Sequence, residues 1–303
     1  MSGFVFLHTP VSPNLAEWVR RVDLLLFLAL LEAVYVGGWW VLRTRGHTRV
    51  AGGGPLARSL LGFAFLVMAL VSPFETWQRY SFAAHMLQHE LLMLAAPLFL
   101  SARPMPMSLW GLPGQWRKRL GAVLAAGRPV RVLVDFLLHP WVALAASLLI
   151  LWTWHLPPLY NGVQASRLLH DFQHTNFFAS GLLLWWPIIR AAPYRYRWSQ
   201  AEGILYGLVA YVLVAMTLRS LLGAYFTLTD RPVYAYYVGV LGPRALEDQR
   251  LAGLVMWLVP LPIFIGAALS AVWPGRPQRV LPQPAARAGS STCAYQPTGG
   301  GEG

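Results

Sequence analysis

The stretch Phe82–Ser101, FAAHMLQHELLMLAAPLFLS, decides the fold that we predict for this chain. A helix needs about 20 mostly apolar residues to cross a bilayer core of about 30 Å, and this stretch has that length and composition. Six further apolar stretches share its character, and they lie near Asp23–Leu42, Ser59–Phe74, Trp141–His155, Thr175–Ile189, Gly203–Leu222 and Leu251–Trp273. The sequence therefore predicts an all-α, polytopic bundle of seven transmembrane helices.

The composition excludes a water-soluble protein. Of the 303 residues, 56% are hydrophobic and 12% are charged, whereas a soluble domain carries about 25% charged residues. The mean hydropathy is +0.47. Because the hydrophobic residues come in long blocks, the composition also excludes a chain that is disordered throughout. The one cysteine, Cys293, has no second cysteine in the chain to pair with.

The basic residues predict how the bundle is oriented. The chain has 24 Lys and Arg against 12 Asp and Glu. Sixteen of the basic residues fall in the segments after the first, third, fifth and seventh spans, and seven fall on the other side. Since cytoplasmic loops are enriched in Lys and Arg, we predict a multi-pass plasma-membrane protein with its N-terminus outside and its C-terminus in the cytoplasm. The basic loops would contact anionic membrane lipid, and the positive charge does not indicate nucleic-acid binding.

We divide the chain into three parts. Residues 1–22 are expected to form an outer segment at the membrane interface, and residues 23–273 form the seven-span domain. Residues 274–303 are rich in Pro, Gly, Ala and Ser, a composition typical of disorder. We predict that they form a disordered cytoplasmic tail.

Five histidines are predicted to gather at the outer side of the bundle. His85 and His89 lie in the first turns of the third span, and His155 ends the fourth. His170 and His174 precede the fifth. Each pair has i, i+4 spacing, so its two rings project from one helical face. Imidazole is a ligand for copper, zinc and iron, and the five histidines are therefore candidate metal ligands.

Two other side chains are candidates for the same site. Met93 continues the stripe of His85 and His89 by another four residues, and a thioether ligand favours Cu(I). Asp248, at the outer start of the seventh span, is a candidate ligand or an acceptor that orients an imidazole. The sequence His89-Glu90 begins like a zinc-protease motif, but Met93 stands where the motif needs its second histidine. The zinc-protease interpretation therefore fails. We predict a non-catalytic protein.

Two charged residues are expected inside the membrane. Glu32 lies in the middle of the first span and Arg219 near the outer end of the sixth. A carboxylate at that depth is costly unless it is paired or protonated. Arg219 is the partner that we consider for Glu32, and a snorkelling arginine is the alternative.

The same residues resemble a known family. HMLQH at 85–89 with MLAAPL at 93–98, WHLPPLY at 154–160 with WWP at 185–187, and DQRLAGLVMW at 248–257 are similar to three blocks of the CtaG family of multi-span cytochrome c oxidase assembly membrane proteins. The resemblance runs over roughly residues 20–273, and the three blocks appear in order. The resemblance implies a role in maturing a haem-copper oxidase, at copper delivery or insertion, with an oxidase subunit as the client.

Two other classes of function stay open at the level of sequence. Histidines on membrane helices also ligate haem, so a haem-binding oxidoreductase or electron carrier is the main alternative. The i, i+4 pairs argue against it, because two residues on one face cannot occupy opposite sides of one haem. A transporter is the third class, although matching pairs of broken helices are not evident in the two halves.

Overall fold

The computed structural model describes residues 21–189 and 201–272, and their secondary structure is entirely helical. The helices up to the middle of the chain are α2 (Val22–Thr44), α3 (Gly53–Leu70), α4 (Phe74–Trp77), α5 (Phe82–Ser101), α6 (Pro104–Gly111), α7 (Gly114–Ala126) and α8 (Arg128–Leu137). They are followed by α9 (Pro140–Trp154), α10 (Pro157–Ala165), α11 (Arg167–Ile189), α12 (Ala201–Leu228), α13 (Ala235–Leu241), the 3₁₀ turn η3 (Gly242–Arg244), α14 (Ala245–Leu258) and α15 (Leu261–Val272). The predicted outer segment, apart from Arg21 and Val22, and the predicted tail 274–303 lie outside the described residues.

Local sequence signals set where several of these helices begin. The side chain of Ser81 accepts a hydrogen bond from the backbone N–H of Ala84, which caps α5. Proline occupies the first position of α6, α9 and α10, where its missing N–H costs nothing and its fixed φ suits a helix. The pair Pro157-Pro158 therefore starts a new helix directly after α9 instead of prolonging it.

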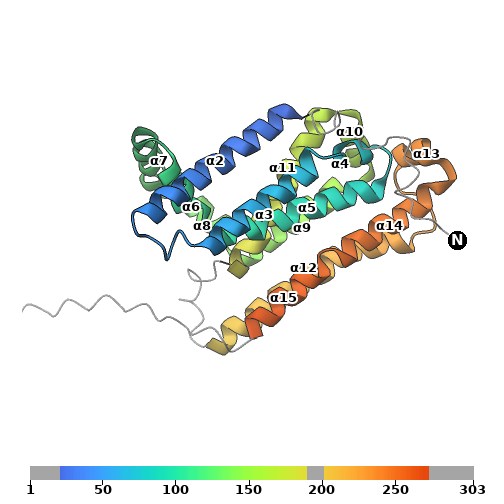
Figure 1. Ribbon diagram of the computed structural model, residues 1–303. Helices are drawn as coiled ribbons and strands as arrows, with labels where there is room; N and C mark the ends of the chain where they lie inside the picture. The colour runs from blue at the N-terminus through green and yellow to red at the C-terminus, as the bar shows by residue number, and fades with distance from the viewer. Residues whose placement is uncertain (1–20, 190–200, 273–303) are drawn as a thin grey trace, which may run out of the picture.

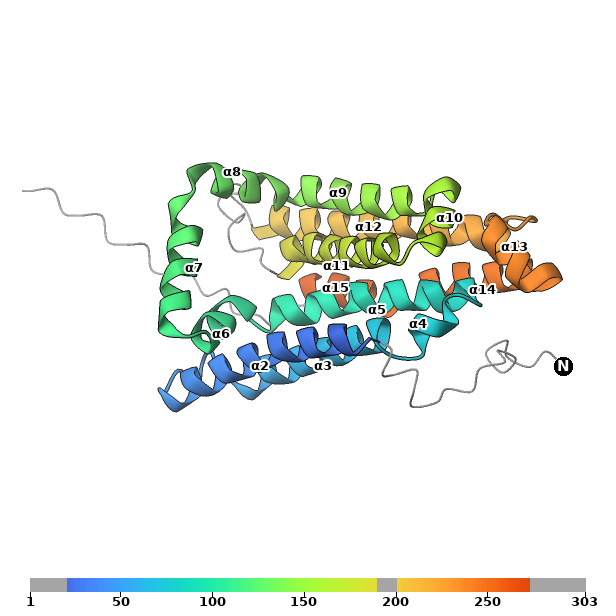
Figure 2. The same cartoon turned by 90° about the horizontal axis from the view of Figure 1, so that it is seen from above.

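Helix α5 lies at the centre of the bundle. It packs against α3, α11 and α14, while α12 packs against α14 and α9. In its most apolar 18-residue stretch 72% of the residues are buried, against 22–33% in the other long apolar segments. Figure 2 shows α2 and α3 on one side of α5, and α11, α9 and α12 on the other. Side chains on every face of α5 are therefore inside the protein, which is how it carries polar groups.

Five helical segments are long and apolar enough to cross a membrane, and a sixth is counted if α9 and α10, bent by 69°, form one span. The five segments correspond to the first, second, third, sixth and seventh predicted spans, and α9 corresponds to the fourth. Helix α11, which contains the fifth, is less apolar because Gln173, His174 and Asn176 lie in its first half. The membrane-protein fold is thus supported, and the count of seven crossings stays a prediction.

The two ends of the bundle differ in chemistry. In Figure 1 the turn between α2 and α3, together with α6 and α7, lies at one end, and α4, α10 and α13 lie at the other. The first end carries the arginines of the connections after the first and third predicted spans. The second end receives the start of α5, the end of α9 and the start of α11, which hold the five histidines. The histidines and the basic loops therefore lie at opposite ends, although the direction in which the bundle faces stays a prediction.

Replacing Gly253 by alanine is expected to destabilise the bundle by about 1–3 kcal/mol, as overpacking does. A Cβ atom at Gly253 of α14 would meet the Thr227 hydroxyl and would lie 2.5 Å from the backbone oxygen of Gly223 of α12. Small residues at such crossings let helix backbones approach closely. The midpoint of thermal unfolding in detergent measures the effect. Gly266→Ala is the matched control, because a Cβ there has no neighbour within 4 Å, and an equal loss in both variants would contradict the prediction.

Candidate metal centre

The five predicted histidines come together at one end of the bundle. His85 and His89 project from the first two turns of α5, and His170 and His174 project from the first two turns of α11. His155 follows the last residue of α9, where Pro157 diverts the chain into α10. All five are buried, with 0–5% of their surface exposed. A buried imidazole nitrogen needs a hydrogen-bond partner or a metal, so the surroundings of each ring nitrogen show what the site can bind.

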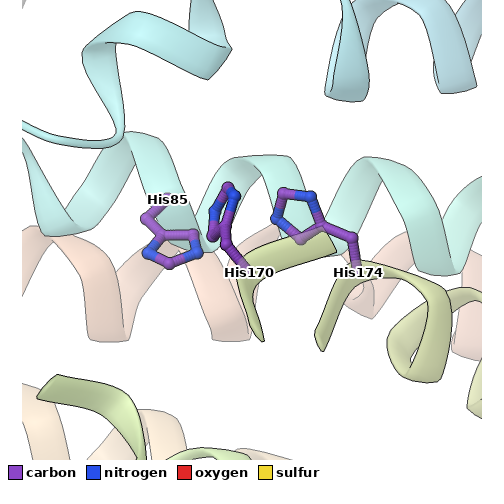
Figure 3. Close-up of side chains that lie close together, drawn as sticks. All are labelled: His85, His170 and His174. Atoms are coloured by element: carbon purple, nitrogen blue, oxygen red, sulfur yellow. The ribbon is translucent and has the colours of Figure 1, made fainter. Parts of the chain in front are cut away.

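Three of the histidines form a compact group that is suited to a metal ion. One ring nitrogen from each of His85, His170 and His174 lies within 4.8 Å of the corresponding nitrogens of the other two. Figure 3 shows the three rings side by side between α5 and α11. The Nε2 atom of each ring is buried and has no hydrogen-bond partner within the described residues. A metal ion would take one nitrogen from each ring, so these residues fit one.

The other ring nitrogen of His85 is held by a chain of hydroxyl groups. Nδ1 lies 2.5 Å from the Tyr160 hydroxyl, which lies 3.3 Å from the Tyr237 hydroxyl. Tyr237 donates to the backbone oxygen of Gln78 at 2.7 Å. When Nδ1 carries the proton, each group in turn donates to the next, and Nε2 keeps its lone pair for a metal. The Gln164 Nε2 atom lies 3.0 Å from Nδ1, so this tautomer requires the Gln164 amide to be turned over, with its oxygen toward Nδ1, an assignment that the hydrogen-bond network decides.

A carboxylate faces the outer nitrogen of His170. The Glu75 Oε1 atom lies 3.8 Å from His170 Nδ1, and Glu75 Oε2 accepts a hydrogen bond from Gln88 Nε2 at 3.0 Å. Metal-bound histidines commonly have a carboxylate on the nitrogen that is not bound. Glu75 reaches this position from α4, the short helix between α3 and α5. Glu75 is therefore a charged neighbour of the trio, and the sequence alone did not predict it.

An ion pair lies next to this site, at the same end of the bundle. Arg21 donates to the two carboxylate oxygens of Asp171 at 2.8 and 3.2 Å, and it lies 4.0 Å from Glu75. Burial lowers the pKa of the Arg21 guanidinium, but its hydrogen bond and charge interaction with Asp171 outweigh burial and raise the pKa overall. Arg21 therefore stays charged and joins the start of α2 to α11, next to His170.

A cavity leads from the surface to the trio. It has a volume of about 230 Å³ and is lined by Glu75, Gln78, Arg79, Val163, Gln164, Ala165, Arg167 and His170. Four of these residues, Glu75, Gln78, Gln164 and His170, also belong to the site, so the cavity borders it directly. An ion entering here would meet the carboxylate of Glu75 and the amides of Gln78 and Gln164, together with the guanidinium groups of Arg79 and Arg167, before it reached His170.

The remaining two histidines, His89 and His155, do not line the cavity. The His89 ring stacks on Phe177 with centroids 4.1 Å apart, and neither of its nitrogens has a hydrogen-bond partner among the described residues. His155 Nδ1 lies 2.7 Å from the backbone oxygen of Leu151, and its Nε2 lies 3.3 Å from the sulfur of Met86. The five histidines thus divide into the trio, called outer because His170 lines the cavity, and the pair of His89 and His155, called inner because neither residue lines it.

The structure places the other two candidate ligands away from the rings. The sulfur of Met93 accepts from the Ser180 hydroxyl at 3.4 Å, one turn and more beyond His89. The carboxylate of Asp248 accepts from Ser81 Oγ at 2.7 Å and from the backbone N–H of Phe82 at 2.5 Å. Asp248 therefore accepts hydrogen bonds from backbone amides at the N-terminus of α5 that have no partner within the helix, and its charge complements the helix dipole. It holds the start of the helix that carries His85 and does not itself contact an imidazole in the described contacts.

The intramembrane charges pair differently from the expectation. Arg219 of α12 donates to both oxygens of Glu90 on α5, at 2.9 and 3.1 Å. Glu32, the partner considered for it, instead accepts a hydrogen bond from Ser59 Oγ at 2.9 Å. The physical reason is packing, because α12 contacts α14, α15 and α9 whereas α2 contacts α6 and α3. The pairing of Glu32 with Arg219 is therefore corrected to Glu90 with Arg219.

Four residues of the site went unrecognised in the sequence: Met86, Glu75, Tyr160 and Tyr237. Met86 and Tyr160 stand inside the quoted blocks HMLQH and WHLPPLY, so a signal for them existed. Glu75 is an acidic residue just before α5, but a charge between two spans is more often solvated. Nothing in the sequence near Tyr237 distinguishes it from the neighbouring tyrosines.

The fold and the site define a class, a helical membrane protein with a buried cluster of histidines at one end. Comparison with known proteins then assigns the family. The family model for the cytochrome c oxidase caa3 assembly factor, Caa3_CtaG, matches residues 33–274. The chain belongs to this family, as the resemblance predicted.

One curated relative is an uncharacterised protein of Mycobacterium leprae (strain TN), 24% identical over 303 residues. The match covers 91% of this chain but 43% of the relative, so the chain spans less than half the length of that protein. No solved structure matches the chain significantly.

Proposed function

We propose that this chain is a non-catalytic assembly factor that holds copper as cargo for a cytochrome c oxidase subunit. The observation that carries the proposal is the grouping of His85, His170 and His174: each brings one ring nitrogen to within 4.8 Å of the others, and the buried Nε2 atom of each ring has no hydrogen-bond partner within the described residues. Leaving a buried polar atom unpaired costs about 1–3 kcal/mol. Three such buried atoms in one cluster of histidines would be hard to retain unless they bind something.

The chemistry of the donor set suits a transient cargo. Neutral imidazoles bind copper without contributing negative charge, so the ion is held by ligands that an acceptor can displace one at a time. The cavity lined by Glu75, Gln78 and His170 supplies the route by which a ligand of the client would approach. With the arginine-rich end in the cytoplasm, this cavity faces the outer side of the plasma membrane, and the transfer takes place there.

The arrangement favours a single ion over haem. Axial imidazoles of a haem lie on opposite faces of the macrocycle. In the trio, the ring centroids of neighbouring histidines are separated by 4.1 Å for His170 and His174, and by 5.2 Å for His85 and His170. The rings therefore contact one another directly, and each i, i+4 pair projects from one face of its helix.

Metal content of the purified, full-length protein tests the proposal. Protein in detergent is incubated with Cu(I), freed of unbound metal and assayed for copper and for absorbance in the Soret region. We expect copper uptake, no Soret band, and a fall in Cu(I) affinity of tenfold or more in a His85→Ala, His170→Ala double variant. His47→Ala, in the exposed turn after α2, is the control and should bind copper as the wild type does. A Soret band without copper uptake would overturn the proposal in favour of a haem protein.

A further inference from the structure

The tautomer of His155 is fixed by its surroundings. Its Nδ1 lies 2.7 Å from the backbone oxygen of Leu151. A carbonyl oxygen only accepts hydrogen bonds, so Nδ1 must carry the proton and donate it. In the neutral imidazole the other nitrogen, Nε2, then has no proton and presents a lone pair.

That lone pair faces a second one. The Nε2 atom of His155 lies 3.3 Å from the thioether sulfur of Met86, and both atoms are buried. A thioether carries no proton either, so neither atom donates to the other. With metal–nitrogen and metal–sulfur bonds of about 2.0 and 2.3 Å, two ligand atoms on one tetrahedral ion lie about 3.5 Å apart. The two atoms are thus within a few tenths of an ångström of the spacing that a shared ion requires.

His89 lies close to His155 and also to the outer trio. Its ring centroid is 4.4 Å from His85, 5.4 Å from His174 and 6.1 Å from His155. Both of its nitrogens are buried without a hydrogen-bond partner among the described residues. The stack of its ring on Phe177 fixes its plane. One imidazole with two unpartnered nitrogens therefore lies beside both His155 and the trio.

We infer that Met86 and His155, with His89 as a ligand shared with the trio, form a second and inner position for Cu(I). The inference rests on the proposed function and adds that the chain holds two copper ions at chemically different positions. Thioether sulfur selects Cu(I) over harder divalent ions, whereas the outer trio offers nitrogen alone. An ion moves inward by ligand exchange, losing imidazole nitrogens of the trio while it gains His155 Nε2 and the Met86 sulfur. The copper stays Cu(I) throughout, so the step needs no oxidant or reductant.

The test is the number and the ligands of the bound ions in the full-length protein in detergent. Cu(I) is titrated against a competing chelator, and X-ray absorption at the copper edge reports sulfur neighbours. Wild type is expected to bind two Cu(I) with sulfur scattering at about 2.3 Å. Met86→Leu is expected to bind one, with nitrogen neighbours only. Met93→Leu is the matched control, because it removes a sulfur from the same helix that contacts Ser180 and no histidine in the described contacts, and it should keep both ions.

The outcomes separate this inference from the proposed function. One Cu(I) per wild-type chain with nitrogen ligands only would overturn the inner position and leave the outer trio standing. No copper on any variant would overturn both. Two ions with unchanged sulfur scattering in Met86→Leu would also overturn the inference. A Met86→Leu chain that unfolds at a lower temperature is compared with His155→Gln, which should lose the same ion by removing the nitrogen side of the pair.

Discussion

Arg219→Leu is expected to prevent the protein from being recovered in a folded form. The substitution leaves the Glu90 carboxylate, 2% exposed on the central helix, without its partner. Removing one member of a buried pair costs about 3–5 kcal/mol, which is a large share of the 5–15 kcal/mol that stabilises a typical protein. The yield of monodisperse protein and the midpoint of thermal unfolding in detergent measure the effect.

Two further variants show whether the unpaired charge is the cause. A Glu90→Gln, Arg219→Gln double variant removes both charges and should recover most of the stability, since two neutral amides can hydrogen-bond to each other. Arg250→Leu breaks an exposed pair with Asp230 of 3.4 Å, and exposed pairs contribute about 1 kcal/mol or less. Wild-type stability in Arg219→Leu, or a double variant no better than the single one, would show that the pair does not hold α5 against α12.

The sequence was sufficient for those features that depend on one helix at a time. Long apolar runs predicted the helices, and i, i+4 spacing predicted that each histidine pair shares a face. Since all three histidine segments begin or end at the same predicted side of the membrane, their meeting followed from topology. The structure brings His85, His170 and His174 within ligand distance of one another, although it leaves their metal untested.

The features that depend on contacts between helices were out of reach. Counting in steps of four from His89 pointed to Met93, but the sulfur beside an imidazole is that of Met86, because α9 ends at the level of Met86 and brings His155 there. Similarly, Glu32 and Glu90 are both acidic residues inside apolar spans. Only the packing of the bundle decides that Arg219 reaches Glu90. A single sequence does not indicate which helices pack against each other.

In cells that lack their own copy of this protein, His170→Asn is expected to reduce cytochrome c oxidase activity tenfold or more relative to the complementing wild type. His170 supplies one of the three ligand nitrogens of the outer trio, and it is the member of the trio that lines the cavity. Asparagine keeps a polar side chain of smaller size but lacks an imidazole nitrogen. Loss even of a residue that supports a metal ligand costs 10–100-fold in metal affinity, so loss of the ligand should cost at least as much. His47→Ala, at the opposite end of the bundle, should complement fully.

Copper supplementation distinguishes loss of cargo from loss of structure. If His170→Asn weakens binding, excess copper in the medium refills the site by mass action, and both the oxidase activity and the copper content of the purified oxidase should rise toward wild type. Arg219→Leu, which is expected to remove the folded protein itself, should stay inactive at every copper concentration. The two variants therefore separate along one axis, with copper rescuing the one and not the other. An oxidase with full copper content in His170→Asn cells without supplementation would remove the trio from the delivery route.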